Sequence, residues 1–218
     1  MSDDAAARFD TVADRYSQRY ADPRAVASFY VRLVRSWGSA VEPGASVLEV
    51  SCADGFMTEA LIDAGYSVTG IDVSPRMVEV ARARLAKRGL IADLRVADVA
   101  TFVPDEPVDV LLAPMWTFFA YVHNAAAVLD RLAPKVRIKA IVDANPRDLP
   151  PQAAERIVAA SGFDRTDWRP VGVPLTRKLG RTSRMALRAA LGFAPARDVI
   201  LKRRFNAAIL GEKVRQKA

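Results

Sequence analysis

The sequence predicts an α/β fold, with one domain built on a doubly wound, mostly parallel sheet. Between residues 46 and 160, short apolar runs rich in β-branched residues alternate with segments of helical spacing. The joints between them are only a few residues long, which is typical of strand–helix–strand units around a parallel sheet. The runs are apolar throughout rather than at every second position, as expected for strands buried on both faces.

The expected elements follow one another in regular order. Five strands are expected at 46–50, 67–71, 91–97, 108–112 and 136–142. Helices are expected at 56–64, 75–88, 124–132 and 152–160, the second of them opened by Ser74. A sixth strand at 166–171, an inserted basic helix at 182–191 and a seventh strand at 202–210 complete the pattern.

Two helices are expected ahead of the first strand. The first shows aromatic and apolar side chains at helical spacing: Phe9, Val12, Tyr16 and Tyr20. The second begins after Asp22, which suits a helix N-cap, with Pro23 in the first turn. Pro43 and Gly44 then break the chain before the sheet begins.

Composition limits the class of protein. The 218 residues fit one domain, and 51% hydrophobic with 26% charged residues is usual for a globular chain. Cys52 is the only cysteine, which excludes an intramolecular disulfide and a cysteine-based zinc site. No apolar run is long enough for a membrane-spanning helix, and the acidic N-terminus lacks a signal-peptide pattern. A cytoplasmic protein is therefore expected.

Positive charge is concentrated near the C-terminus. Residues 165–218 hold 14 Lys and Arg residues against three acids, while the whole chain carries +7. Within them, residues 176–193 resemble an amphipathic cationic helix. This segment could contact an anionic membrane or a phosphate-bearing acceptor, or could simply be a solvated helix face. No nucleic-acid-binding module is recognised, so no nucleic-acid partner is expected.

A loop of small residues follows the first expected strand. Ser51, Ala53 and Gly55 alternate with larger residues, and Glu49 lies in the strand before them. Small residues let backbone amides approach a polar ligand at a helix N-terminus. Because open α/β sheets bind ligands at the carboxyl ends of their strands, this loop is the first candidate for a binding site. An ordinary strand–helix turn is the alternative.

The loop resembles the first motif of the class I S-adenosylmethionine-dependent methyltransferases, which reads acid-x-Gly-x-Gly-x-Gly. Here Glu49 is the acid, and Ser51 and Ala53 replace two of the three glycines. A Cβ at either position narrows the space for the cofactor and disfavours a positive φ. The resemblance implies that Glu49, Ser51, Ala53 and Gly55 belong to the cofactor site.

Two further acids follow strands in the order that this family shows. Asp72 resembles the acid of the second motif, which accepts hydrogen bonds from the ribose hydroxyls, and Val73 and Met77 would then pack near the adenine. Asp98 resembles the acid of the third motif, which accepts from the adenine amino group, while the Val99 amide meets the ring. Each acid could also serve only as a turn former or helix cap.

The resemblance covers roughly residues 10–160 and implies a Rossmann-like sheet with an antiparallel last strand. Residues 1–42 would form an N-terminal helical lid, 43–165 the cofactor-binding core, and 166–218 basic C-terminal strands with an inserted helix. Tyr16 resembles the lid tyrosine that closes over the methionine part, and Ala113 would also border the cofactor. A nicotinamide dehydrogenase is a minor alternative, since its Gly-x-Gly-x-x-Gly fingerprint does not fit the spacing.

The methyl acceptor is expected beyond the fourth and fifth strands. His123, the only histidine, could act as a base near neutral pH, or could cap a helix or lie at the surface. Asp143 is the second catalytic candidate. Contacts to the acceptor are expected from four residues: Trp116, Phe119, Asn145 and Arg147.

The function expected from these observations is methyl transfer from S-adenosylmethionine to an oxygen or nitrogen of a small molecule, such as a natural product or other metabolite. S-adenosylhomocysteine would be the product. One alternative is a protein of the same fold that does not methylate. Another is a methyltransferase acting on a lipid-linked or phosphate-bearing acceptor at a membrane surface. No metal is expected, and a monomer or a homodimer would fit.

Overall fold

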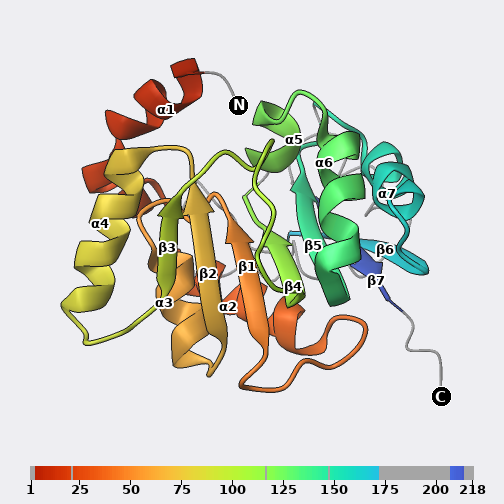
Figure 1. The fold of residues 1–218 in the computed structure, drawn as a ribbon, viewed down its shortest axis with the longest axis horizontal. Coiled ribbons are helices and arrows are strands. Elements are labelled where there is room, and N and C mark those ends of the chain that lie inside the picture. Colours follow the sequence, from red (N-terminus) through yellow and green to blue (C-terminus); the bar gives the residue numbers. More distant parts are fainter. Residues whose placement is uncertain (1–2, 21, 116, 147, 172–206, 214–218) are drawn as a thin grey trace, which may run out of the picture.

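One seven-stranded sheet organises the computed structural model, which describes residues 3–20, 22–115, 117–146, 148–171 and 207–213. The strand order is β3-β2-β1-β4-β5-β7-β6, as Figure 1 shows. The strands are β1 Ser46–Val50, β2 Ser67–Asp72, β3 Asp93–Val96, β4 Val108–Ala113, β5 Val136–Ala144, β6 Arg165–Pro170 and β7 Ala207–Glu212.

The strand directions confirm the doubly wound, mostly parallel sheet. β1 pairs in parallel with β2 and β4, β2 with β3, and β4 with β5. β7 lies between β5 and β6 and runs antiparallel to both. The carboxyl ends of β1, β2, β4 and β5 therefore meet at one edge of the sheet, where strand-to-helix loops can form a common site.

All strands except β1 differ by a residue or more from their expected bounds, and two of the differences are informative. β3 begins at Asp93 rather than at residue 91, and Ile91 is 89% exposed. The expected start of this strand was wrong because Ile91, although apolar, is not buried by the fold. β7 extends to Glu212, whereas residues 202–206 of the expected strand lie outside the described residues, as do the expected basic helix at 182–191 and the segment 176–193.

Seven α-helices surround the sheet in the described part of the chain. They are α1 Asp3–Asp10, α2 Pro23–Ser36, α3 Phe56–Asp63, α4 Pro75–Ala86, α5 Thr117–Tyr121, α6 Ala125–Leu132 and α7 Pro151–Ala160. In Figure 1, α2 and α3 lie behind the sheet, and α6 and α7 in front of it. Along β1, Val47 belongs to the core with α2 and α3, whereas Leu48 and Val50 belong to the core with α6 and α7. The strand thus buries side chains on both faces.

Side-chain caps set the starts of three helices. Asp22 accepts from the Ala25 amide at 2.9 Å, with Pro23 in the first turn, as the sequence predicted. The Ser74 hydroxyl accepts from the Met77 amide at 3.0 Å and opens α4. Asn124 caps α6 in the same way. Each cap satisfies an amide that the helix itself leaves unpaired.

The first N-terminal helix is shorter than its apolar spacing predicted. α1 ends at Asp10, and two 3-10 turns, Ala13–Arg15 and Ser17–Arg19, carry the chain on to Tyr20. Asp10 explains the break, because its carboxylate bonds to the start of α4. A contact with a distant element therefore outweighs local helical periodicity.

A buried lysine fixes the far end of α2. The ammonium of Lys139, on β5, donates to the carbonyls of Leu33 at 3.3 Å, Trp37 at 2.7 Å and Ser39 at 2.8 Å. Leu33 lies in the last turn of α2 and also accepts from the Trp37 amide, whereas Trp37 and Ser39 follow the helix, so the ammonium binds the helix end together with the chain that leaves it. Burial lowers the pKa of Lys139 to about 8. This contact holds α2 against the sheet and with it the side chains that α2 sends toward the carboxyl edge.

Among the described residues, every helix is too short or too polar to cross a membrane. The same residues contain no cluster of three or more His, Cys, Asp or Glu side chains that could hold a metal ion.

Candidate functional site

The turn after β1 has three residues in the left-handed region. The φ angles are +59° at Ser51, +49° at Ala53 and +77° at Gly55. Glycine adopts this conformation freely, but any residue with a Cβ pays about 1–2 kcal/mol for it. Ser51 and Ala53 therefore keep a backbone suited to glycine, and the surrounding contacts must hold it in place. Strain of this kind concentrates at functional sites.

Gly55 differs from Ser51 and Ala53, because a side chain has no room at this position of the motif. A Cβ on Gly55 would lie 2.9 Å from the Cβ of Ala81 on α4. Gly55 is also the N-cap residue of α3. Its lack of a side chain thus allows α3 and α4 to approach each other behind the turn.

Asp72, at the end of β2, braces the strained turn. Its Oδ2 accepts from the Ala53 amide and its Oδ1 from the Ser74 amide, both at 2.9 Å. The side chain is almost fully buried, and burial raises the pKa of Asp72, although the two amides oppose that shift. A carboxylate oxygen has two lone pairs, so each can still accept from a ligand hydroxyl.

Glu49 lies beneath the turn rather than in the pocket lining. It is 1% exposed and accepts from the Thr58 hydroxyl of α3 at 2.6 Å. Burial raises the pKa of Glu49 to about 8, and the nearby carboxylates of Asp72 and Asp54 add to the rise. Glu49 therefore supports the start of α3 from inside the sheet.

The chain from Asp10 to Ser17 is tied to both loops that border the site. Asp10 accepts from the Ser74 hydroxyl and from the Arg76 amide, and Arg76 pairs with Asp14 at 2.6 Å. Further on, the Ser17 amide donates to Asp54 at 3.1 Å. The N-terminal segment is thus bound to α4 at one end and to the turn after β1 at the other.

Asp54 also links the N-terminal segment to the C-terminal end of α4. Arg84 donates to its carboxylate at 2.9 Å and to its backbone carbonyl at 2.8 Å. The same guanidinium reaches the Ser17 hydroxyl at 3.0 Å. Asp54 is nearly fully buried, so this is a shielded ion pair within the strained turn.

A pocket opens between these loops and the N-terminal segment. Its cavity volume is about 10 Å³, little more than one water molecule requires, so the N-terminal segment nearly fills it. Its lining comprises Phe9, Tyr16, Ser51, Ala53, Asp72, Met77, Thr117 and Tyr121. Five of these were predicted from the sequence as cofactor-binding residues. One buried carboxylate, a turn of close backbone and several aromatic rings suit a ligand that has both hydroxyl groups and a planar ring.

Other predicted cofactor residues are not among the residues that line this pocket. Val73 is half-buried between Asp72 and Ser74, and Ala113 is fully buried at the end of β4. Asp98 accepts from the Ala100 amide at 2.8 Å and so forms a turn. The Val99 carbonyl accepts from Arg131 at 2.7 Å.

Asp143 lies near the carboxyl end of β5, as expected, but its side chain is buried in the protein core. It is fully buried, and its Oδ2 accepts from the Tyr30 hydroxyl and from the Met115 amide, the latter at 3.0 Å. Burial beside this carboxylate raises the pKa of Tyr30 far above its ordinary value, so the phenol keeps its proton and acts as donor. Met115 has a φ of +68°, a third non-glycine residue in the left-handed region.

The remaining predicted residues are less central. His123 is exposed in the turn before α6. Phe119 is half-buried and packs edge-to-face on Phe118, and the carbonyl of Asn145 accepts from the amides of Asp148 and Leu149. Trp116 and Arg147 lie outside the described residues.

Three lining residues were not predicted as site residues. Phe9 contacts Tyr121 edge-to-face with ring centroids 5.4 Å apart, so α1 and α5 meet over the pocket. Thr117 and Tyr121 both belong to α5, a five-residue helix that the sequence analysis did not predict. The aromatic composition of this stretch was the available signal, and it had been assigned to the acceptor side.

Comparison with known proteins agrees with this geometry. Residues 47–137 match a family model described as a methyltransferase domain. A ubiquinone biosynthesis O-methyltransferase of Xylella fastidiosa is 31% identical over 90 residues, which cover 41% of this chain and 37% of that protein. One from Actinobacillus pleuropneumoniae is 40% identical over 63 residues, covering 29% and 27%. The matches thus span only 37% and 27% of these two relatives.

Solved structures resemble the chain over nearly its whole length. The (4+2)-cyclase SpnF aligns with a TM-score of 0.68 and 18% identity, covering 96% of this chain and 95% of that one. A magnesium protoporphyrin IX methyltransferase of Synechocystis PCC 6803, with bound SAM, aligns with a TM-score of 0.66 and 17% identity, covering 98% and 99%. At such identities the likeness establishes the fold.

Proposed function

We propose that this chain, which belongs to the class I S-adenosylmethionine-dependent methyltransferase family, transfers a methyl group to an oxygen or nitrogen of a small molecule. The observation that carries the proposal is the bond between Asp72 and the Ala53 amide. It places a buried carboxylate beside a turn of close backbone at the carboxyl edge of the sheet. That pairing suits a nucleoside with an amino-acid tail.

The residues present fit S-adenosylmethionine. Asp72 would accept from the ribose hydroxyls, and such charge-assisted bonds contribute about 1.5–3 kcal/mol each. The turn at Ser51, Ala53 and Gly55 would border the methionine part, with Tyr16 covering it. Four further residues would border the adenine: Val73, Met77, Asp98 and Val99. Glu49 would act from below the turn, and Ala113 from the end of β4.

The cofactor supplies a methyl group on a positively charged sulfur, and the protein supplies placement. Transfer needs the acceptor atom in line with the carbon–sulfur bond, and positioning alone can lower the barrier by several kcal/mol. Thr117 and Tyr121 border the pocket on the side where an acceptor would lie, with Phe119 and Asn145 nearby in the chain. Trp116 and Arg147 remain acceptor contacts proposed from the sequence alone.

Neither predicted catalytic residue lines the described pocket. His123 is exposed, and Asp143 is buried and engaged by Tyr30 and Met115. The proposal therefore relies on orientation of the acceptor rather than on a general base from these two residues. The cover formed by Phe9 and Tyr16 must move aside for a complete cofactor to bind.

The proposal is tested by binding and by turnover. Calorimetry should give a Kd for S-adenosylhomocysteine, and radiolabelled methyl should appear on at least one member of a panel of phenols, catechols and amines. Absence of cofactor binding by the folded wild-type protein would refute the proposal.

A second function is favoured by the replaced glycines and by one structural neighbour. Ser51 and Ala53 both strain the cofactor turn, and the cyclase SpnF shares the fold. A protein that binds the cofactor without methyl transfer would show a tight complex with S-adenosylmethionine that releases no labelled methyl to any acceptor in the panel. Transfer to one acceptor excludes this second function.

A further inference from the structure

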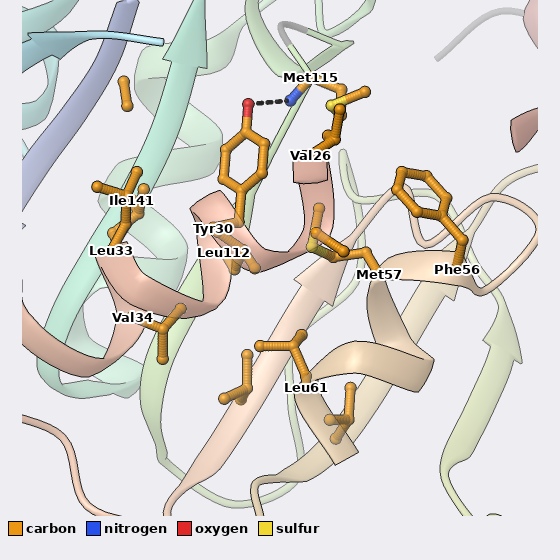
Figure 2. Packing of buried hydrophobic residues seen from close by; sticks show 14 of the residues in the cluster. Val26, Tyr30, Leu33, Val34, Phe56, Met57, Leu61, Leu112, Met115 and Ile141 are labelled. Atoms are coloured by element: carbon orange, nitrogen blue, oxygen red, sulfur yellow. Dashed lines mark hydrogen bonds between the residues drawn. The ribbon is translucent and has the colours of Figure 1, made fainter. Parts of the chain in front are cut away.

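Two buried side chains and one backbone amide from distant parts of the chain meet near the start of α5. Tyr30 comes from α2, Asp143 from β5 and Met115 from the turn after β4. One oxygen, Oδ2 of Asp143, accepts from both the Tyr30 hydroxyl and the Met115 amide. Figure 2 shows the Tyr30 hydroxyl pointing at the Met115 nitrogen, 3.4 Å away.

This cluster fixes a backbone conformation that Met115 does not favour. With a φ of +68°, Met115 would prefer to relax toward negative φ. Its amide instead points at a carboxylate inside the protein, and leaving such a buried donor without its acceptor is unfavourable. Tyr30 in turn gives the carboxylate a second donor, which keeps Asp143 aimed at the turn.

The fixed turn leads directly into a wall of the pocket. Two residues after Met115, Thr117 begins α5, and Thr117 and Tyr121 both line the pocket. Tyr121 also meets Phe9 of the N-terminal cover. A rotation at Met115 would therefore swing α5 relative to Ser51 and Asp72 on the opposite side.

We infer that Tyr30 and Asp143 are positioning residues for methyl transfer, which act through the Met115 turn to hold α5 against the acceptor. This rests on the proposed function. It assigns Asp143, a catalytic candidate from the sequence, a positioning role instead, and it gives Tyr30 a role that its core position alone would not suggest. The cofactor loops after β1 and β2 lie outside this cluster, so cofactor affinity should change little when the cluster is altered.

The test compares Tyr30→Phe with a matched control, Tyr66→Phe. The Tyr66 hydroxyl is also buried and donates to the Val41 carbonyl at 3.0 Å, but just ahead of β2, at the opposite edge of the sheet. Each variant loses the hydrogen bond that one buried phenol donates, and Tyr30→Phe also loses the longer bond from the Met115 amide, at 3.4 Å. A difference between the two variants in the hydrogen exchange of α5 would therefore reflect where the lost bond lies and not a general loss of stability. Asp143→Asn is a third variant, and Tyr30→Phe carries the test if Asp143→Asn does not fold.

Hydrogen exchange and turnover are the two readouts. In Tyr30→Phe, amides of the Met115 turn and α5 should exchange at least tenfold faster than in wild type, while the Kd for S-adenosylhomocysteine stays within threefold. The kcat for an acceptor found in the panel should fall at least fivefold, with the KM for S-adenosylmethionine unchanged. Tyr66→Phe should leave all three near wild type.

Two failures can be told apart. If wild-type protein binds no cofactor, the proposed function is wrong and the inference falls with it. If wild type binds cofactor but Tyr30→Phe matches Tyr66→Phe in the exchange of α5, the inference alone is wrong. The exchange measurement needs no acceptor, so it decides the inference even where the panel yields none.

Discussion

The carboxylate of Asp72 and the backbone amide of Ala53 are joined by a 2.9 Å hydrogen bond across the ends of two neighbouring strands. This bond links the turn after β1 to the start of α4, because the same carboxylate holds the Ser74 amide. A single side chain thus sets the distance between the two loops that border the pocket.

Replacing Asp72 with alanine should weaken cofactor binding at least tenfold, about 1.4 kcal/mol. The variant loses the acceptor for the ribose and the brace on the strained turn. Calorimetry with S-adenosylhomocysteine measures the change. Asp93→Ala, which removes an exposed acid at the start of β3, is the control. Unchanged affinity in a folded Asp72→Ala protein would contradict the assignment of this pocket.

Glycine at position 53 should stabilise the protein by about 1 kcal/mol. The native φ of +49° is unfavourable for alanine and free for glycine, although part of the gain is lost to the greater entropy of the unfolded chain. Urea denaturation provides the measurement. Ala83→Gly, in the exposed interior of α4, should instead destabilise by about 1 kcal/mol. Equal losses in both variants would show that strain at position 53 is absent.

Stability should fall with rising pH because of Glu49. The pKa of Glu49 rises from 4.5 to about 8 on folding, so between these values the folded protein holds a proton that the unfolded chain has lost. The contribution is complete below pH 4.5 and is lost as pH rises to 8, by about 1.4 kcal/mol per unit. The free energy of unfolding, measured at several pH values, should lose this slope in Glu49→Gln.

The exposed Glu42 provides the control for that experiment. Glu42→Gln should keep the wild-type slope. A slope that survives in Glu49→Gln would mean that another group carries the pH dependence.

Lys139→Met should destabilise the protein by roughly 3 kcal/mol or more. The variant removes the buried ammonium that donates to the carbonyls of Leu33, Trp37 and Ser39, and a buried acceptor that loses its donor costs about 1–3 kcal/mol. Arg137→Met, two residues earlier on β5, removes an exposed ion pair with Asp109 and should cost less than about 1 kcal/mol. Denaturant unfolding of both variants makes the comparison, and similar losses would contradict it.

Local patterns predicted the sheet because each strand carries its own signal. β1 occupies the residues expected for it, and Asp22 and Ser74 cap helices as their positions suggested. Five pocket residues were also predicted: Ser51, Ala53 and Asp72 from motifs at strand ends, Met77 from the helix after the second motif, and Tyr16 from its resemblance to a lid tyrosine. The left-handed φ of Ser51 and Ala53 could not be predicted from residue type, because it depends on Asp72 holding the turn.

Contacts between distant segments account for what was missed. Tyr30 and Asp143 are 113 residues apart, and neither sequence neighbourhood signals the other. Asp10 ends α1 through Ser74, so apolar spacing alone overestimated that helix. The burial of Asp143 and the exposure of His123 are likewise properties of the assembled fold, which is why an acid and a base candidate from the sequence lie outside the pocket lining.

The antiparallel direction of β7 bears on which end of the chain suits the fusion of an affinity tag. β7 runs antiparallel to β5 and returns from the carboxyl edge (Figure 1). Glu212 near its end therefore pairs with Lys139 and Arg165, away from the pocket, whereas Phe9 near the start of the chain lines it. The chain therefore reaches Lys213, beside Ile138 of β5, away from the pocket, which makes the C-terminal side the better choice for an affinity tag or a surface-coupling group. The same fusion placed at the front of α1 would crowd the very segment that must swing aside.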